Sequence, residues 1–143
     1  MAEEMSEAEW RAFVTLGTRT AALATIRRDG RPHVAPIWFV LDDDGSVVFT
    51  TAADSVKGKS LQRDPRVSLC VDDATPPFSF VLIEGTATIS ADLDEMLRWA
   101  TQIGGRYMGA DQADAFGRRN AVEGELLVRV APDRVIARKN IAA

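Results

Sequence analysis

Short strand-like segments joined by tight turns dominate this sequence and limit what it can fold into. The turn signals Asp29-Gly30 and 42–45 separate three such segments in direct succession. Strands that follow one another in this way favour a barrel or sandwich over an alternating βαβ fold. We therefore predict one mainly β domain over residues 1–143, with three or four peripheral helices. The predicted strands cover residues 20–26, 32–41, 47–51, 66–71, 78–89, 125–130 and 134–137. Within the fifth of them, Gly85 is predicted to mark a bulge or a site of close backbone approach.

Four helices are predicted around these strands. Ser6 and Glu9 have the spacing of a capping box, and so do Asp92 and Glu95. The second pair starts the longest helix, which Gly104-Gly105 is expected to end or kink. The other two predicted helices run from Asp54 or Ser55 up to Pro65, and from Asp111 to Arg119.

Composition excludes several classes of protein. The net charge of -4 argues against a general nucleic-acid binder. No apolar run approaches the roughly 20 residues that a membrane span needs, and the N-terminus lacks a secretory pattern, so we expect a cytoplasmic protein. Cys70 and His33 are the single residues of their types, which argues against a metal site built from cysteines or histidines.

The second predicted strand is apolar on both of its faces. One face carries Val34, Pro36, Trp38 and Val40, and the other carries Ala35, Ile37, Phe39 and Leu41. One face of an antiparallel sheet is normally solvated. Either a ligand or another subunit is therefore expected to cover the second face of this strand.

The third predicted strand leads into a short cationic helix. Four cations lie between Lys57 and Arg66, against the single anion Asp64. Free N–H groups at the start of this helix and three nearby hydroxyls can converge with Lys57 on one phosphate. These hydroxyls belong to Thr50, Thr51 and Ser55. The alternative is a solvated surface helix, which is what most charge runs form.

Four segments of the sequence occur together in a familiar order. They cover residues 23–26, 29–39, 49–67 and 83–87, and the third, which begins Phe-Thr-Thr-Ala-Ala-Asp-Ser-Val-Lys, is the most specific. The combination resembles the split β-barrel flavin and deazaflavin oxidoreductases, the superfamily that includes pyridoxamine 5'-phosphate oxidase. The short chain resembles the branch that uses coenzyme F420, a 5-deazaflavin, in place of FMN.

This resemblance implies an FMN-binding split barrel of the Greek-key type. It also implies a homodimer that holds the cofactor in a groove at the subunit interface. By position, Lys57 would bind the cofactor phosphate, surrounded by Ser55, Thr50, Thr51 and Lys59. Pro36, Ile37 and Trp38 would lie along the ring system, and Phe78 and Phe80, from the same chain or from the partner subunit, are candidates for packing beside it.

The implied function is an F420-dependent oxidoreductase that acts on a small conjugated substrate such as an enone, a quinone or a tetrapyrrole. Hydride transfer from a deazaflavin requires placement of the reactants and no acid–base pair, so we assign no catalytic residue. If a proton is needed, solvent or the region of Arg106, Tyr107 and Arg118 could supply it. The alternatives are an FMN-dependent enzyme related to pyridoxamine 5'-phosphate oxidase and a non-catalytic protein that binds F420 or a flavin.

Overall fold

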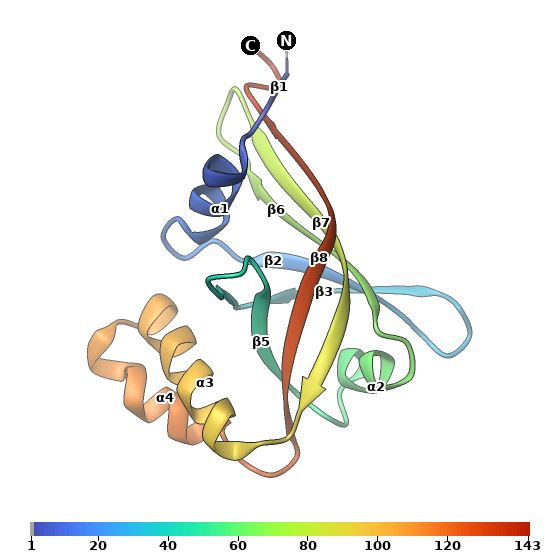
Figure 1. Cartoon of the computed structure of the whole chain (residues 1–143), viewed down its shortest axis with the longest axis vertical. Helices are drawn as coiled ribbons and strands as arrows, with labels where there is room; N and C mark the ends of the chain where they lie inside the picture. The colour runs from blue at the N-terminus through green and yellow to red at the C-terminus, as the bar shows by residue number, and fades with distance from the viewer. Residues whose placement is uncertain (1) are drawn as a thin grey trace.

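A computed structural model describes residues 2–143 and confirms the mainly β fold (Figure 1). Its antiparallel strands form one curled sheet in the order β3-β2-β6-β7-β8-β5-β4, and β1 pairs with β8. The strands are β1 Glu3–Glu4, β2 Ala21–Ile26, β3 Pro32–Ile37, β4 Val40–Leu41, β5 Val47–Ala52, β6 Arg66–Asp73, β7 Ser79–Ser90 and β8 Glu125–Lys139. The helices are α1 Glu7–Thr15, α2 Val56–Arg63, α3 Leu93–Met108, the 3₁₀ helix η1 Ala110–Gln112 and α4 Ala113–Asn120. Among these described residues, no helix is long and apolar enough to cross a membrane.

The helix starts follow the signals in the sequence. At α1, Ser6 Oγ accepts the Glu9 N–H and Glu9 Oε1 accepts the Ser6 N–H, each at 3.1 Å, which completes the predicted capping box. At α3, Asp92 Oδ1 accepts two backbone N–H groups of the first turn. The N-cap of α2 is Ser55, whose Oγ accepts the Gly58 N–H at 3.0 Å. These bonds satisfy donors that the first turn of a helix otherwise leaves unpaired.

The prediction that Gly104-Gly105 ends the third helix is wrong, while the alternative of a kink there stays a prediction. Helix α3 continues through both glycines to Met108. A Cβ atom on Gly104 would lie 2.6 Å from the Cβ of Phe116, so this glycine instead allows α4 to pack closely on α3. Close packing of two helices, rather than a break in one of them, explains why glycine stands there.

The two predicted closing strands are one strand. Residues 125–139 form β8 without interruption, and the register of β7 against it shifts between Glu84 and Gly85. Gly85 pairs with Pro132 and Glu84 with Arg134, which leaves Asp133 as the extra residue of a bulge. The bulge predicted beside Gly85 is therefore confirmed, with its extra residue on β8. The close backbone approach is also present, because a Cβ atom on Gly85 would lie 2.4 Å from the Ala131 carbonyl oxygen.

The predicted strand 32–41 is broken at Trp38 and Phe39. Strand β3 ends at Ile37, and only Val40–Leu41 continue as β4, which pairs with β5. At the break, the backbone N–H of Phe39 donates to Tyr107 Oη at 3.1 Å, and its carbonyl accepts from Arg106 at 2.6 Å. Side chains of α3 thus replace a neighbouring strand as the partners of this backbone.

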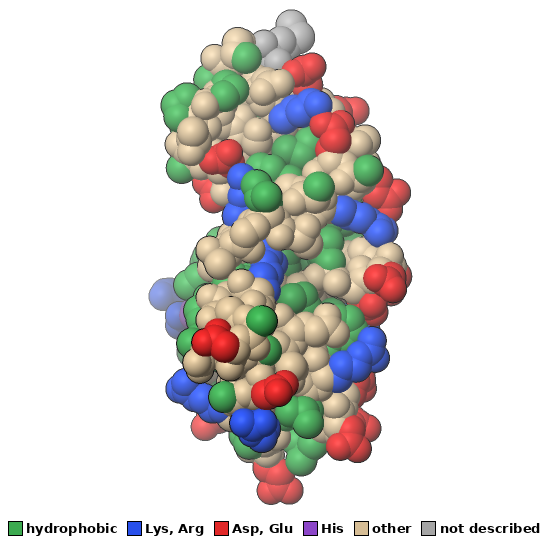
Figure 2. All heavy atoms as spheres, turned by 90° about the vertical axis from the view of Figure 1, so that its left-hand side faces the viewer, with side chains coloured by type: hydrophobic (Ala, Val, Ile, Leu, Met, Phe, Trp, Pro, Cys, Tyr) green, Lys and Arg blue, Asp and Glu red, His purple; other side chains and the backbone are tan. Residues whose placement is uncertain are grey.

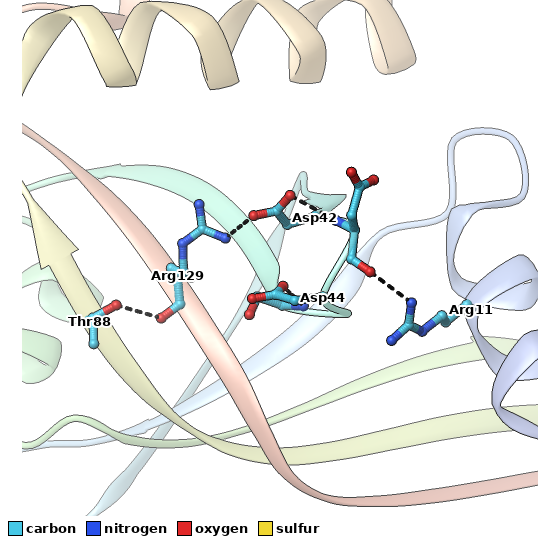
Figure 3. Close-up of polar contacts among 7 residues, drawn as sticks. Arg11, Asp42, Asp44, Thr88 and Arg129 are labelled. Atoms are coloured by element: carbon cyan, nitrogen blue, oxygen red, sulfur yellow. Dashed lines mark hydrogen bonds and ion pairs between the residues drawn. The ribbon is translucent and has the colours of Figure 1, made fainter.

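The acidic turn at residues 42–45 is held by two arginines (Figure 3). Arg129 of β8 forms an ion pair with Asp42, and Arg11 of α1 donates to the Asp43 carbonyl at 3.0 Å. The Ser46 N–H donates to Asp44 and lowers the pKa of that carboxyl. These contacts tie the β4–β5 turn to β8 and α1. The acidic residues therefore have a structural role, and no ligand is needed to explain them.

The two faces of the sheet differ in what covers them. The inner face packs into the core around Leu23, Leu69 and Ile83, each at most 1% exposed. The outer face carries an apolar row that crosses five strands through directly paired positions. We call this the outer apolar row, and it consists of Pro36, Ala22, Cys70, Leu82 and Ile136. No residue of the row is fully buried in the single chain.

Candidate functional site

A cavity of about 240 Å³ lies where the end of β3, the start of α2 and the α3–α4 hairpin meet. We call it the Lys57 cavity. Its lining residues are Pro36, Ile37, Trp38, Thr50, Lys57, Ile103, Phe116 and Asn120. The first five were predicted from the sequence to contact a cofactor. The structure therefore brings the predicted phosphate lysine and the three predicted ring contacts into one cavity.

Strand β5 and the cap of α2 place Lys57 in this cavity. The strand pairs with β8 up to Ala52, and the chain then turns sharply, with the Ser55 N–H bonded to the Ala52 carbonyl. Gly58 permits this turn, because a Cβ atom there would lie 2.1 Å from the Ala52 carbonyl oxygen. The helix consequently starts close against the strand end, with the side chain of Lys57 directed to the cavity.

The hydroxyls of Thr51 and Ser55 already have partners inside the chain. Ser55 Oγ donates to the Ala52 carbonyl at 2.7 Å, and Thr51 Oγ1 lies 3.2 Å from Ser55 Oγ. Since Ser55 has one proton, Thr51 is the donor between these two hydroxyls. Thr51 is also 5% exposed. Both residues build the turn behind the cavity, and their contact with a phosphate stays a prediction.

Lys59 lies on another side of α2. It lines a second, cationic cavity of about 660 Å³, together with Arg27, Arg28 and Arg63. Residues two positions apart on a helix point in directions about 160° apart, so Lys57 and Lys59 face opposite sides of α2. The structure thus separates Lys59 from the predicted phosphate position.

Phe78 and Phe80 are far from the Lys57 cavity within one chain. Phe80 pairs with Arg138 of β8, whereas Thr50 pairs with Leu127, eleven positions earlier on the same strand. At about 3.3 Å per residue this separation is roughly 35 Å along the strand. Figure 1 shows the start of β7 beside the chain termini, at the end opposite α2. The alternative that Phe78 and Phe80 of one protomer pack against the cofactor held by the other protomer stays a prediction.

Three residues of the cavity were missed in the sequence. Ile103 comes from α3, and Phe116 and Asn120 come from α4. Phe116 stacks on Trp38 with ring centroids 5.8 Å apart, and the Asn120 side chain donates to the Phe116 carbonyl. Gly104 was the available signal, because a glycine inside a helix often marks a close neighbour, here Phe116.

Arg106 and Tyr107 hold backbone groups. The Arg106 guanidinium donates to the carbonyls of Val14, Gly17, Arg19 and Phe39. Tyr107 Oη donates to the Arg19 carbonyl at 2.8 Å and accepts the Phe39 N–H. Burial lowers the pKa of Arg106 and raises the pKa of Tyr107. Both groups are therefore engaged in the fold, while the third suggested proton source, Arg118, is exposed on α4.

One carboxylate modifies the electrostatics of the site. Burial raises the pKa of Glu125, nearby Lys57 lowers it, and Asp54 raises it further. The positive charge of Lys57 is therefore partly offset by Glu125.

Among residues 2–143, no group of three or more His, Cys, Asp or Glu side chains is placed to hold a metal ion. Acidic and basic side chains are interspersed on the face formed by α1 and the α3–α4 hairpin (Figure 2).

Comparison with known proteins identifies the family. The family model of pyridoxamine 5'-phosphate oxidase matches residues 6–138. The chain belongs to the pyridoxamine 5'-phosphate oxidase family. This membership confirms the predicted split β-barrel and the predicted superfamily of flavin-type oxidoreductases.

Solved structures show how varied the proteins on this barrel are. The conserved hypothetical protein Rv2991 of Mycobacterium tuberculosis is 33% identical, with a TM-score of 0.84 over 95% of this chain and 86% of that chain. An F420 reductase is 24% identical, with a TM-score of 0.66 over 87% and 94% of the two chains. The haem-storage protein HutZ of Vibrio cholerae is 19% identical, with a TM-score of 0.72 over 92% and 94%. The last two likenesses show the pyridoxamine 5'-phosphate oxidase-like fold alone.

Proposed function

We propose that this chain is an F420-dependent oxidoreductase that transfers hydride between the deazaflavin and a small conjugated organic substrate. The observation that carries the proposal is that Lys57 and the segment 36–38 line the same cavity. The lining of this cavity combines the cation of Lys57 with apolar and aromatic side chains. A flat ring system with a phosphate on its side chain matches this combination.

The residues present fit such a cofactor. Lys57 and the Thr50 hydroxyl line the cavity and would hold the phosphate. Ile37, Trp38 and Phe116 offer apolar surface to the ring system. Strand β3 lies at the end of the strand order, so one side of its backbone has no strand partner and can bond to the polar edge of the ring.

We also propose that the protein is a homodimer whose second copy completes the site. The Lys57 cavity, at about 240 Å³, is smaller than the roughly 300–1,000 Å³ of typical cofactor sites. Pro36 belongs both to this cavity and to the outer apolar row, so the cavity opens at the edge of the uncovered sheet face. A second copy packed on that row would bury it and would close the cavity from outside.

The bound deazaflavin would supply the hydride chemistry. The chain's own contribution is to fix the phosphate at Lys57, to orient the ring along 36–38 and to limit access of water. No side chain of the cavity is required to move a proton. The substrate would enter on the face of the ring that the chain leaves open.

Two other functions have specific support. Membership of the pyridoxamine 5'-phosphate oxidase family favours FMN as the alternative cofactor. The likeness to a haem-storage protein favours a non-catalytic binding protein as the third candidate. The cytoplasmic location expected from the sequence stays a prediction.

Fluorescence titration of the purified protein with F420 and with FMN tests the proposal. We expect F420 to bind the more tightly, and Lys57→Ala to weaken its binding by about 1.5–3 kcal/mol, the value of a charged hydrogen bond. Lys59→Ala, which removes the same charge from another side of α2, should change the affinity by less than about threefold. Tenfold tighter binding of FMN would overturn the choice of F420, and equal effects of the two variants would remove Lys57 from the site.

Turnover separates the enzyme from a binding protein. Reduced F420 should be oxidised when the protein is mixed with an enone or quinone acceptor, and Lys57→Ala should lower the rate at limiting cofactor. Tight binding of F420 without oxidation by any acceptor of these classes would favour the non-catalytic function.

A further inference from the structure

We propose that Tyr107 and Arg106 are positioning residues for Trp38, the aromatic wall of the Lys57 cavity. The inference rests on the proposed function, because it assigns a role to these residues in binding the ring of the cofactor. Neither residue lines the cavity. They act on it through Trp38 and through the backbone of Phe39.

The ring of Tyr107 contacts Trp38 directly. The two ring centroids are 4.8 Å apart and the planes differ by 7°, which is a stacked arrangement. Phe116 also stacks on Trp38, at 5.8 Å and 28°. Trp38 nevertheless remains 41% exposed and lines the cavity. Its indole is thus supported by two rings while part of it stays open to a ligand.

The hydroxyl of Tyr107 fixes the backbone that carries Trp38. It accepts the Phe39 N–H at 3.1 Å and donates to the Arg19 carbonyl at 2.8 Å. These bonds occur where β3 and β4 are interrupted, so no neighbouring strand defines the position of this backbone. The position of Trp38 therefore depends on one side chain of α3 for both its ring contact and its backbone contact.

Arg106 binds the carbonyl of Phe39, the residue whose N–H is bound by Tyr107. Its Nη1 donates to the Phe39 carbonyl at 2.6 Å, and its remaining bonds reach the carbonyls of Val14, Gly17 and Arg19. The guanidinium also lies over the rings of Phe39 and Tyr107, at 4.7 and 4.8 Å. No carboxylate bonds to it among residues 2–143. Its planar set of donors therefore holds two backbone segments, 14–19 and Phe39, in one arrangement.

A purely structural role is the alternative, because the same bonds tie α3 to the barrel. That role predicts lower stability without an effect on the cofactor, and at Trp38 only the change of signal that removal of the stacked Tyr107 ring itself causes. Positioning predicts that Trp38 moves and that the ring binds less well, even while the fold is retained.

Fluorine NMR on protein labelled with 5-fluorotryptophan distinguishes the two roles. The chain has three tryptophans, Trp10, Trp38 and Trp99, and loss of one signal in Trp38→Phe assigns the relevant resonance. In Tyr107→Leu, without cofactor, we expect the Trp38 signal to shift while the Trp10 and Trp99 signals keep their positions. Tyr107→Phe, which keeps the ring and loses the hydroxyl, should give a smaller shift.

Titration of the same variants with F420, and with FMN in parallel, completes the test. We expect Tyr107→Leu to weaken binding about three- to tenfold, from the typical free energy of one aromatic pair. Arg119→Met, at an exposed cation of α4, is the control and should bind as the wild type does. If Tyr107→Leu does not fold, as loss of all three native signals would show, Tyr107→Phe decides the matter.

Two results would overturn the inference: an unmoved Trp38 signal in both Tyr107 variants, or a moved signal with affinity within twofold of the wild type. Failure of the proposed function gives a different pattern. In that case Lys57→Ala leaves binding unchanged, while the Trp38 signal of the cofactor-free protein still reports whether Tyr107 positions it.

Discussion

Replacement of Gly58 by alanine tests whether the close approach of α2 to β5 builds the Lys57 cavity. Gly58 lies inside a helix, where alanine is normally preferred by about 1 kcal/mol. The added Cβ atom would stand 2.1 Å from the Ala52 carbonyl oxygen and 3.0 Å from Ser55 Oγ. An ordinary contact between such atoms is above 3 Å, so backbone rather than a flexible side chain has to move.

The magnitude of the clash decides the sign of the effect. Overpacking of this kind costs about 1–3 kcal/mol and leads here to loss of the Ser55 cap, which is worth a further ~1 kcal/mol. These costs exceed the gain of about 1 kcal/mol in helix propensity. We therefore expect Gly58→Ala to lower the free energy of unfolding by about 1–3 kcal/mol. Since α2 must shift, binding of the cofactor should weaken as well.

Gly105→Ala is the matched control, because it makes the same change inside α3. There the added Cβ atom would lie 3.6 Å from the Cβ of Ala113, an ordinary contact. The helix propensity then dominates, and the variant should be more stable by about 0.5–1 kcal/mol. Urea denaturation followed by circular dichroism measures both variants. Equal or greater stability of Gly58→Ala, with unchanged cofactor affinity, would refute the reasoning.

Three further predictions concern the dimer, the acidic turn and the charge at the site. Leu82→Arg places a charge in the outer apolar row, so light scattering after size exclusion should show a monomer, and cofactor binding should weaken at least about tenfold because the partner no longer closes the cavity. A dimer that survives this change would place the interface elsewhere. Asp42→Asn and Arg129→Met should each destabilise the protein, and the double-mutant cycle should give a coupling of about 1 kcal/mol, since both side chains are 28% exposed. Additive effects would mean that the ion pair contributes nothing. Glu125→Gln removes the carboxylate beside Lys57 and should tighten F420 binding about two- to fivefold. Because burial raises the pKa of Glu125, wild-type affinity should increase as the pH falls through that raised pKa, and the variant should lack this increase. The same pH dependence in both proteins would exclude Glu125 as its cause.

Features that depend on neighbouring residues in the chain were predictable from the sequence. The capping box of Ser6 and Glu9, the start of α2 at Ser55 and the bulge at Gly85 all lie where local patterns indicate them. The two helix starts are decided by hydrogen bonds within a few residues. At Gly85 the glycine itself is the signal, because the backbone of β8 passes too close for a Cβ atom. The five predicted residues of the Lys57 cavity come from two short segments, and the resemblance to the family, rather than a local pattern, indicated that 36–38 and Lys57 would lie at one site.

Features that depend on distant residues were not predictable in this way. The break after Ile37 results from bonds that Phe39 makes to Arg106 and Tyr107, nearly seventy positions later. Gly104 looks like a helix end in the sequence, but its small size serves contact with Phe116. Strand β8 reads as two strands because the bulge interrupts its alternation of side chains.

The walls of the site show the same limit. Ile103, Phe116 and Asn120 reach the cavity only because α3 and α4 fold back together over the sheet. Lys59 follows Lys57 by only two positions. Helix geometry nevertheless places it in the other cavity, with Arg63 and with Arg27 and Arg28 of the β2–β3 connection. A motif specifies which residues are near one another in sequence, and the turn of the helix decides which of them share a cavity.

A crystal structure of the protein with F420 tests the central claim most directly. We predict a dimer packed through the outer apolar row, with the cofactor ring against residues 36–38 and its phosphate within about 3 Å of Lys57 Nζ. Cofactor bound away from the Lys57 cavity, or a cavity closed by side chains of the chain itself in the complex, would contradict it.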